Sequence, residues 1–236
     1  MTSKLISNIG QLITNSDENL GIINNAALLI DDGKVAWIGP NSAAPMADTN
    51  VDAANGVVAP GFVDSHTHAV FAGDRHKDFV ARMAGTKYAA GGIRTTVAAT
   101  RKASKDELIR ATKTLVDRAK KSGTTTIEIK SGYGLDVETE KKILEVAKQF
   151  TDESTFLGAH VVPEEFTNNR SGYIDLVKGE MLDACAPLAK WIDVFCDTNA
   201  FTVDEAREIL KSGIAKGLKA RIHGNQLGDT GGAELA

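Results

Sequence analysis

The sequence predicts an α/β fold in which about five of the eight units of a parallel (β/α)8 barrel of the TIM type follow a small β module. From Val57 onward, apolar runs of strand length alternate with helical segments, which is typical of parallel βαβ units. Four of the five histidines lie at the carboxyl ends of those runs, where parallel barrels carry their chemistry. These four are His66, His68, His160 and His223.

The composition is that of an ordinary folded chain. Its 236 residues are 42% hydrophobic and 25% charged, with a net charge of -4 and no basic stripe, so we expect no nucleic-acid partner. No apolar stretch has membrane-spanning length, and the amino terminus becomes polar too early for a signal sequence. We therefore expect no membrane association and a cytoplasmic location. Cys185 and Cys196 are too few for a disulfide framework.

The first part, residues 1–56, reads as a small sheet. The runs 27–31 and 34–39 flank Asp32-Gly33, a dipeptide that favours a type I′ hairpin turn. The change of pattern at Val57 predicts a second domain over residues 57–236.

Capping signals and glycines delimit the helices of the second part. Ser104 opens a helix to about Lys121, Asp136 one to about Gln149, and Thr202 one to about Lys216; the first and third begin with a capping box. A further helical stretch covers about 173–185. Strands are predicted at 57–63, 124–130, 155–159, 191–196 and 218–222. A full barrel needs eight strands and about 250 residues, so we expect an incomplete barrel.

His66 and His68 are one residue apart at the end of the first predicted strand. If the two-residue alternation continues, both imidazoles point to the same side. Surface histidines are the ordinary alternative, but the position at a strand end favours half of a metal site.

Several motifs resemble those of known enzymes. The run 60–68 resembles the first barrel strand of the amidohydrolase superfamily, and residues 1–56 resemble part of its β-sandwich domain. Within that superfamily, the sequence is similar to the imidazolonepropionase family. The runs that carry this similarity are 66–75, 130–135, 158–163, 193–196, 223–227 and 231–235.

The resemblance implies an activity and a set of site residues. The family hydrolyses 4-imidazolone-5-propanoate to N-formimidoyl-L-glutamate in histidine degradation, with one Zn²⁺ or Fe³⁺ ion, and is commonly a homodimer. It implies His66, His68 and His223 as metal ligands, with an Asp of the eighth strand that lies beyond residue 236. Substrate contacts are implied for Arg75, Tyr88, Tyr133 and His160, and catalytic roles for His160 and Gln226.

The chemistry suits these residue types. A metal ion polarises the ring carbonyl and lowers the pKa of bound water from 15.7 to about 7, and three protein ligands leave room for that water. The amide of Gln226 cannot act as a base and is expected to orient substrate or water. A cationic fork suits the anionic propionate.

Two alternatives stay open. In the first, the chain belongs to another amidohydrolase, a cyclic amidase or an aminohydrolase, in which a carbamylated Lys130 bridges two metal ions. In the second, it is a shortened, non-catalytic binding protein. We also expect residues 89–97 to form a loop, and we expect the 236-residue chain alone to be inactive.

Overall fold

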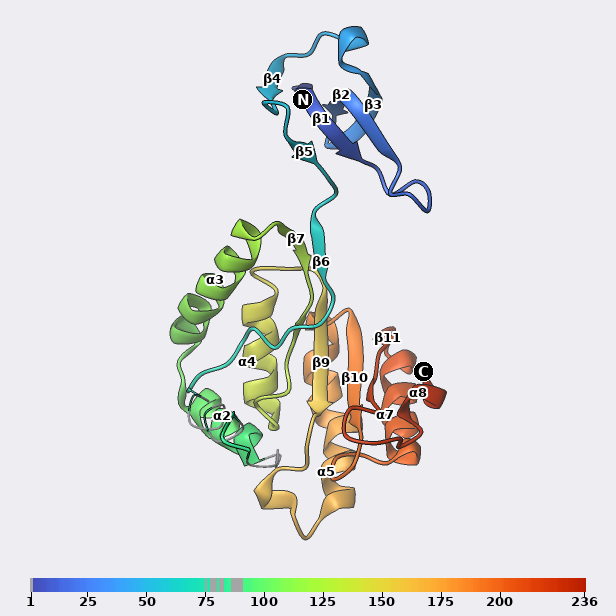
Figure 1. Cartoon of the computed structure of the whole chain (residues 1–236). Coiled ribbons are helices and arrows are strands. Elements are labelled where there is room, and N and C mark those ends of the chain that lie inside the picture. Colours follow the sequence, from blue (N-terminus) through green and yellow to red (C-terminus); the bar gives the residue numbers. More distant parts are fainter. Residues whose placement is uncertain (1, 75, 77–79, 81–82, 86–90) are drawn as a thin grey trace. The chain divides into compact units, whose positions relative to one another are not determined.

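The computed structural model describes residues 2–74, 76, 80, 83–85 and 91–236. The chain divides into two compact units, Met1–Gly61 and Phe62–Ala236, which are coloured from blue to red along the sequence in Figure 1. The sequence analysis places the division after residue 56, a few residues earlier.

The first unit is a five-stranded sheet in the order β3-β2-β1-β4, with β5 also paired to β1. Its β2 is antiparallel to β1 and β3, whereas β4 and β5 run parallel to β1. Asp32 and Gly33 both have positive φ, 48° and 71°, so the predicted type I′ hairpin is confirmed. The strands are Lys4–Ile13 (β1), Ile22–Asp31 (β2), Lys34–Pro40 (β3), Thr49–Asp52 (β4) and Val57–Val58 (β5), with a 3₁₀ turn at Asn41–Ala43.

The second unit is built on a curled parallel sheet (Figure 1). β6 pairs with β7, β8 with β9, β9 with β10, and β10 with both β11 and β12, all in parallel. β7 and β8 are one stretch of chain interrupted at Glu128. The five predicted parallel strands therefore lie side by side, as in part of a (β/α)8 barrel. They are Phe62–Asp64 (β6), Thr124–Ile127 (β7), Ile129–Lys130 (β8), Ser154–Ala159 (β9), Trp191–Cys196 (β10), Lys219–Ala220 (β11) and His223–Gly224 (β12).

Two predicted strands differ in the structure. The run 57–63 is not one strand, because Val57–Val58 pairs with β1 whereas Phe62–Asp64 pairs with β7. Pro60 lies between them, and a proline lacks the backbone N–H that a continuous ladder needs. The last predicted strand, 218–222, is shorter than expected and is followed by β12, which begins at His223.

Helices flank the sheet. α3 packs on β7, α4 on β8 and β9, and α7 on β10 and β11. None of the helices within the described part of the chain is both long and apolar enough to cross a membrane. Within the described ranges, the helices include Gly91–Lys102 (α2), Lys105–Lys121 (α3), Val137–Ala147 (α4), Arg170–Leu176 (α5), Leu182–Cys185 (α6), Val203–Ala215 (α7) and Gly232–Leu235 (α8), with a π-helical turn at Val177–Met181 and 3₁₀ turns at Glu164–Phe166 and Ala186–Leu188.

The helix starts follow the capping signals. Both predicted capping boxes are present, at Ser104 with Glu107 and at Thr202 with Glu205. Each reciprocal pair satisfies backbone N–H groups that have no partner inside the helix. The expectation of a loop over 89–97 is wrong for residues 91–97, because α2 begins at Gly91.

A buried carboxylate holds the turn between β8 and α4. The side chain of Glu140 accepts hydrogen bonds from the backbone N–H groups of Gly132, Gly134 and Leu135, at 2.7–2.8 Å for the shortest contact of each. Gly132 has a φ of +104°, and a Cβ at this position would lie 3.0 Å from His160 Nδ1 and from the Leu157 carbonyl oxygen. The turn therefore requires glycine for both its backbone angle and its contacts.

We expect Gly132→Ala to lower the free energy of unfolding by about 3 kcal/mol, because it combines a positive φ with steric overlap. Gly217→Ala is the matched control: its φ is +87° with no atom within 4 Å of the added Cβ, so only the backbone cost of about 1 kcal/mol applies. Urea unfolding measures both. Equal losses of unfolding free energy in the two variants would show that the turn at Gly132 accommodates the added methyl group without steric cost.

Candidate metal centre

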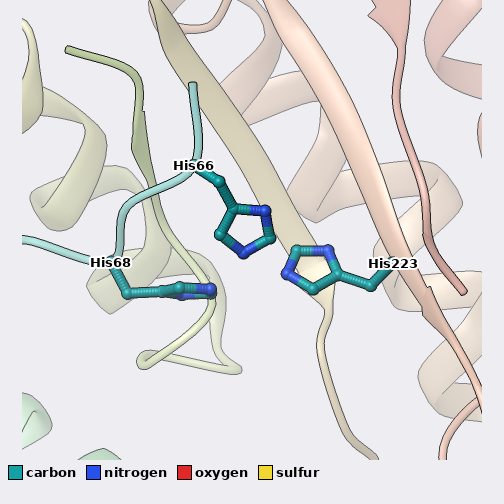
Figure 2. Close-up of side chains that lie close together, drawn as sticks. All are labelled: His66, His68 and His223. Atoms are coloured by element: carbon teal, nitrogen blue, oxygen red, sulfur yellow. The ribbon is translucent and has the colours of Figure 1, made fainter. Parts of the chain in front are cut away.

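Three imidazoles converge at the carboxyl end of the parallel sheet. One ligand nitrogen from each of His66, His68 and His223 lies within 4.8 Å of the others. The ring centroids are 4.3 Å apart between His66 and His223 and 5.5 Å apart between His66 and His68. Figure 2 shows the rings turned toward a common space.

The three residues reach this space from opposite ends of the described sheet. His66 and His68 follow β6, and the backbone there stays paired, because Lys130 N–H donates to the Thr67 carbonyl at 2.9 Å. The strand itself ends at Asp64, so the predicted strand alternation does not extend to the two histidines, but their rings still face a common space (Figure 2). His223 opens β12, where it pairs with Phe195 of β10. Parallel pairing and the curl of the sheet thus bring residues far apart in sequence together.

The environment favours neutral imidazoles. Burial lowers the pKa of His68 well below its ordinary value, and the nearby rings of His160 and His223 lower it further. Burial also lowers the pKa of His66, with smaller contributions from His223 and Lys130. A neutral imidazole has the free lone pair that a metal ion needs.

The donor set fits a metal ion. His68 Nδ1 and His223 Nε2 are buried without a hydrogen-bond partner in the described structure, and a buried polar atom without a partner is costly. Imidazole nitrogens suit zinc and iron. His66, His68 and His223 are therefore the residues that would hold the ion.

A buried carboxylate lies behind the third ligand. Asp193 Oδ2 is 3.0 Å from His223 Nδ1, a hydrogen-bond distance, although the contact is not aligned as a hydrogen bond. Burial alone raises the pKa of Asp193, but His223 and Lys130 outweigh that effect and lower the pKa to about 2. Asp193 is thus a carboxylate, and carboxylates commonly orient metal-binding histidines in this way.

The histidines open into a cavity of about 230 Å³. Tyr133 and His160 lie beside His68, with ring centroids 5.4 Å and 5.1 Å from it. His160 Nδ1 is 2.8 Å from the Gly132 carbonyl oxygen. Since a carbonyl only accepts, Nδ1 carries the hydrogen and the lone pair of the neutral ring is on Nε2. The lining residues are His66, His68, Ile93, Tyr133, His160, Phe195, His223 and Gln226.

A second carboxylate fixes the loop that carries Gln226. Asp197 Oδ2 accepts the backbone N–H groups of Gln226 and Leu227 at 2.6 Å and 2.9 Å. Burial raises the pKa of Asp197, but the hydrogen bonds from the backbone N–H groups of Leu227, Thr198 and Gln226 outweigh it, so the pKa is lowered. The position of Gln226 in the cavity therefore depends on Asp197.

Lys130 is placed for ion pairing and not for carbamylation. Its Nζ lies 2.7 Å from Glu128 Oε1 and 2.9 Å from Asp193 Oδ2, and its side chain is only 1% exposed. A carbamylated lysine is anionic and would face two buried carboxylates, which like-charge repulsion disfavours. The two-metal alternative based on Lys130 conflicts with these contacts.

The structure brings six of the eight residues proposed for the site around one cavity. Arg75 and Tyr88 lie outside the described residues. The sequence analysis assigned no role to Asp193, which contacts a histidine, or to Asp197, which holds a loop. A charged residue inside the apolar run 191–196 was the available signal for Asp193. The six are His66, His68, Tyr133, His160, His223 and Gln226.

Comparison with known proteins identifies close relatives. No family model matches the chain. The chain is 56% identical over 241 residues to an imidazolonepropionase of Mycolicibacterium smegmatis, covering 100% of the chain and 61% of that protein. It is 54% identical to the imidazolonepropionase of Salinispora tropica, with the same coverage, and 48% identical to that of Rhodococcus jostii, covering 99% of the chain and 58% of the relative. The chain thus spans about three fifths of these relatives.

Solved structures share the fold at low identity. A triazine hydrolase from Arthobacter aurescens superimposes with a TM-score of 0.58 at 14% identity, covering 94% of this chain and 52% of that one. Molinate hydrolase gives a TM-score of 0.57 at 12% identity, covering 93% and 53%. These likenesses show the amidohydrolase barrel fold. Over its whole length the chain is therefore similar to about three fifths of the length of these imidazolonepropionases, and it shares the barrel fold of these hydrolases.

Proposed function

We propose that the protein hydrolyses the cyclic amide C–N bond of 4-imidazolone-5-propanoate to give N-formimidoyl-L-glutamate, and that residues 1–236 supply most of its active site. The observation that carries this proposal is the convergence of His66, His68 and His223 within 4.8 Å at the carboxyl end of the sheet. The identity to imidazolonepropionases supports the choice of substrate.

The three histidines would hold one Zn²⁺ or Fe³⁺ ion. When bound, such an ion polarises the ring carbonyl and makes water nucleophilic near neutral pH. The chain's own contribution is to favour the neutral form of His68 by burial and to place Asp193 behind His223. We assign the fourth ligand to an Asp that the family resemblance implies beyond residue 236.

The other cavity residues orient the substrate and move protons. Hydrolysis adds the water oxygen to the carbonyl carbon, breaks the C–N bond and delivers a proton to the departing ring nitrogen. Because Nδ1 of His160 donates to the Gly132 carbonyl, its Nε2 lone pair is suited to accept a hydrogen bond from a ring N–H of the substrate. The Gln226 amide orients substrate or water. The resemblance implies that Tyr133, Arg75 and Tyr88 also contact the substrate.

The assembly follows from the resemblance, and the location is the expectation drawn from the sequence. We propose that the whole protein is a homodimer and acts in the cytoplasm. Sedimentation equilibrium of the whole protein tests the assembly, since a monomer at all concentrations would contradict it.

We expect the 236-residue chain to bind one Co²⁺ ion, used as a spectroscopic probe for the site. Removal of His66, His68 or His223 by alanine substitution should weaken binding by at least about 100-fold, because each removes a direct ligand. His76→Ala is the matched control, since His76 is exposed and lies outside the cluster. Titration followed by visible absorption measures the affinity.

Two results of that titration would contradict the proposal. Binding that survives all three substitutions places the ion elsewhere. Binding of two ions per chain favours the alternative of a two-metal amidohydrolase.

We also expect no turnover of imidazolone propionate by the 236-residue chain above the rate of its His223→Ala variant. The reason is that the implied Asp ligand is supplied by residues beyond 236. The full-length Mycolicibacterium smegmatis relative and the same relative cut to its matching 61% serve as controls. The loss of substrate absorbance measures the rate. Hydrolysis by the 236-residue chain would show that the first five strands suffice.

A further inference from the structure

Three buried charged side chains form a continuous network inside the sheet. Lys130 Nζ contacts Glu128 Oε1 at 2.7 Å and Asp193 Oδ2 at 2.9 Å, and all three side chains are 1–2% exposed. Glu128 also accepts the hydroxyl of Thr155 on β9. Arg221 Nη1 lies 3.4 Å from Glu128. The network thus connects residues of the second, third, fourth and fifth strands.

One end of the network is attached to the segment that carries the first two histidines. Thr67 lies between His66 and His68, and its backbone N–H donates to Glu128 Oε2 at 3.2 Å. The Thr67 hydroxyl donates to the Glu128 carbonyl oxygen at 2.6 Å. Glu128 therefore contacts the HxH segment through both its side chain and its backbone.

The other end of the network is attached to the third histidine. Asp193 Oδ2 contacts Lys130 and also lies 3.0 Å from His223 Nδ1. A carboxylate at this position favours the tautomer with hydrogen on Nδ1, which leaves the Nε2 lone pair for a ligand. His223 Nε2 is buried without a partner in the described structure.

Stability alone does not account for these charges. Removing three charged groups from water carries a large desolvation cost, and apolar side chains of similar volume often give equal or greater stability. A role in fixing the geometry of the histidines would explain why the desolvation cost is tolerated. It would also explain why the network contacts both Thr67 and His223.

We infer that Glu128, Lys130 and Asp193 are positioning residues that hold the two halves of the metal-ligand set, His66 with His68 and His223, at a fixed separation. This inference rests on the proposed metal site. It assigns the network no contact with substrate. The expected effect is therefore on metal affinity and on ligand geometry.

The first test is Asp193→Asn in the 236-residue chain, with Co²⁺ as the probe. The amide keeps the shape of the side chain but removes the charge that orients His223. Loss of such a supporting group commonly weakens metal binding by about 10- to 100-fold. We expect a loss of that size, together with a changed Co²⁺ absorption spectrum in the visible range. Chelator competition measures the affinity, and thermal unfolding without metal measures the stability.

Glu205→Gln is the matched control for a general loss of stability. It removes an ion pair with Arg170 of 2.6 Å in the same unit, and neither residue touches the histidines. Its Co²⁺ affinity and spectrum should equal those of the unsubstituted chain. If Glu205→Gln lowers affinity as much as Asp193→Asn does, the inference is wrong.

A triple variant keeps the test decisive if Asp193→Asn does not fold. Glu128→Gln, Lys130→Met and Asp193→Asn together leave no unpaired charge at these positions, and Arg221 keeps its contact with the Ser65 carbonyl. We expect this variant to fold and to bind Co²⁺ about 10- to 100-fold more weakly. Unchanged Co²⁺ affinity in either folded variant overturns this inference but leaves the proposed metal site in place. If the unsubstituted chain binds no Co²⁺, the proposed metal site fails and the inference falls with it.

Discussion

The interior of the curled sheet depends on compensation of one buried positive charge. Lys130 extends from β8 into a space where its ammonium group has Glu128 and Asp193 as partners, at 2.7 Å and 2.9 Å. Without both carboxylates the ammonium group would be buried unpaired, which commonly costs several kcal/mol. Strands two and four therefore have to keep a register that presents these residues to each other.

Carboxylates also hold the loops at the rim of the sheet. Glu140 binds three backbone N–H groups of the turn that carries Tyr133, and Asp197 binds two of the loop that carries Gln226. Backbone donors in such turns have no ladder partners, so a buried acceptor both satisfies them and limits their motion. The shape of the cavity is consequently set by side chains that do not all line it.

Features that depend on residues close in sequence are predicted well. Features that depend on contacts between residues far apart in sequence are not. The hairpin at Asp32 and the capping boxes at Ser104 and Thr202 depend on residues at most three apart, and the structure has all of them. The division of the run 57–63 between two sheets depends on distant partners, β1 and β7. The role of Asp193 likewise depends on His223, thirty positions away, so the sequence reveals a buried charge but not its neighbour.

The charges behind the histidines also favour a cation in front of them. Glu128, Lys130 and Asp193 contribute two negative charges and one positive charge, a net of minus one. Arg221 lies 3.4 Å from Glu128 and is 24% exposed. It compensates this negative charge only in part, because solvent screens the charge of Arg221. Burial of His68 disfavours a positive charge on its imidazole, and the pKa of His66 is lowered as well. A cation held by His66, His68 and His223 would therefore experience a negative potential from the interior, and the same carboxylate that orients His223 would strengthen its binding.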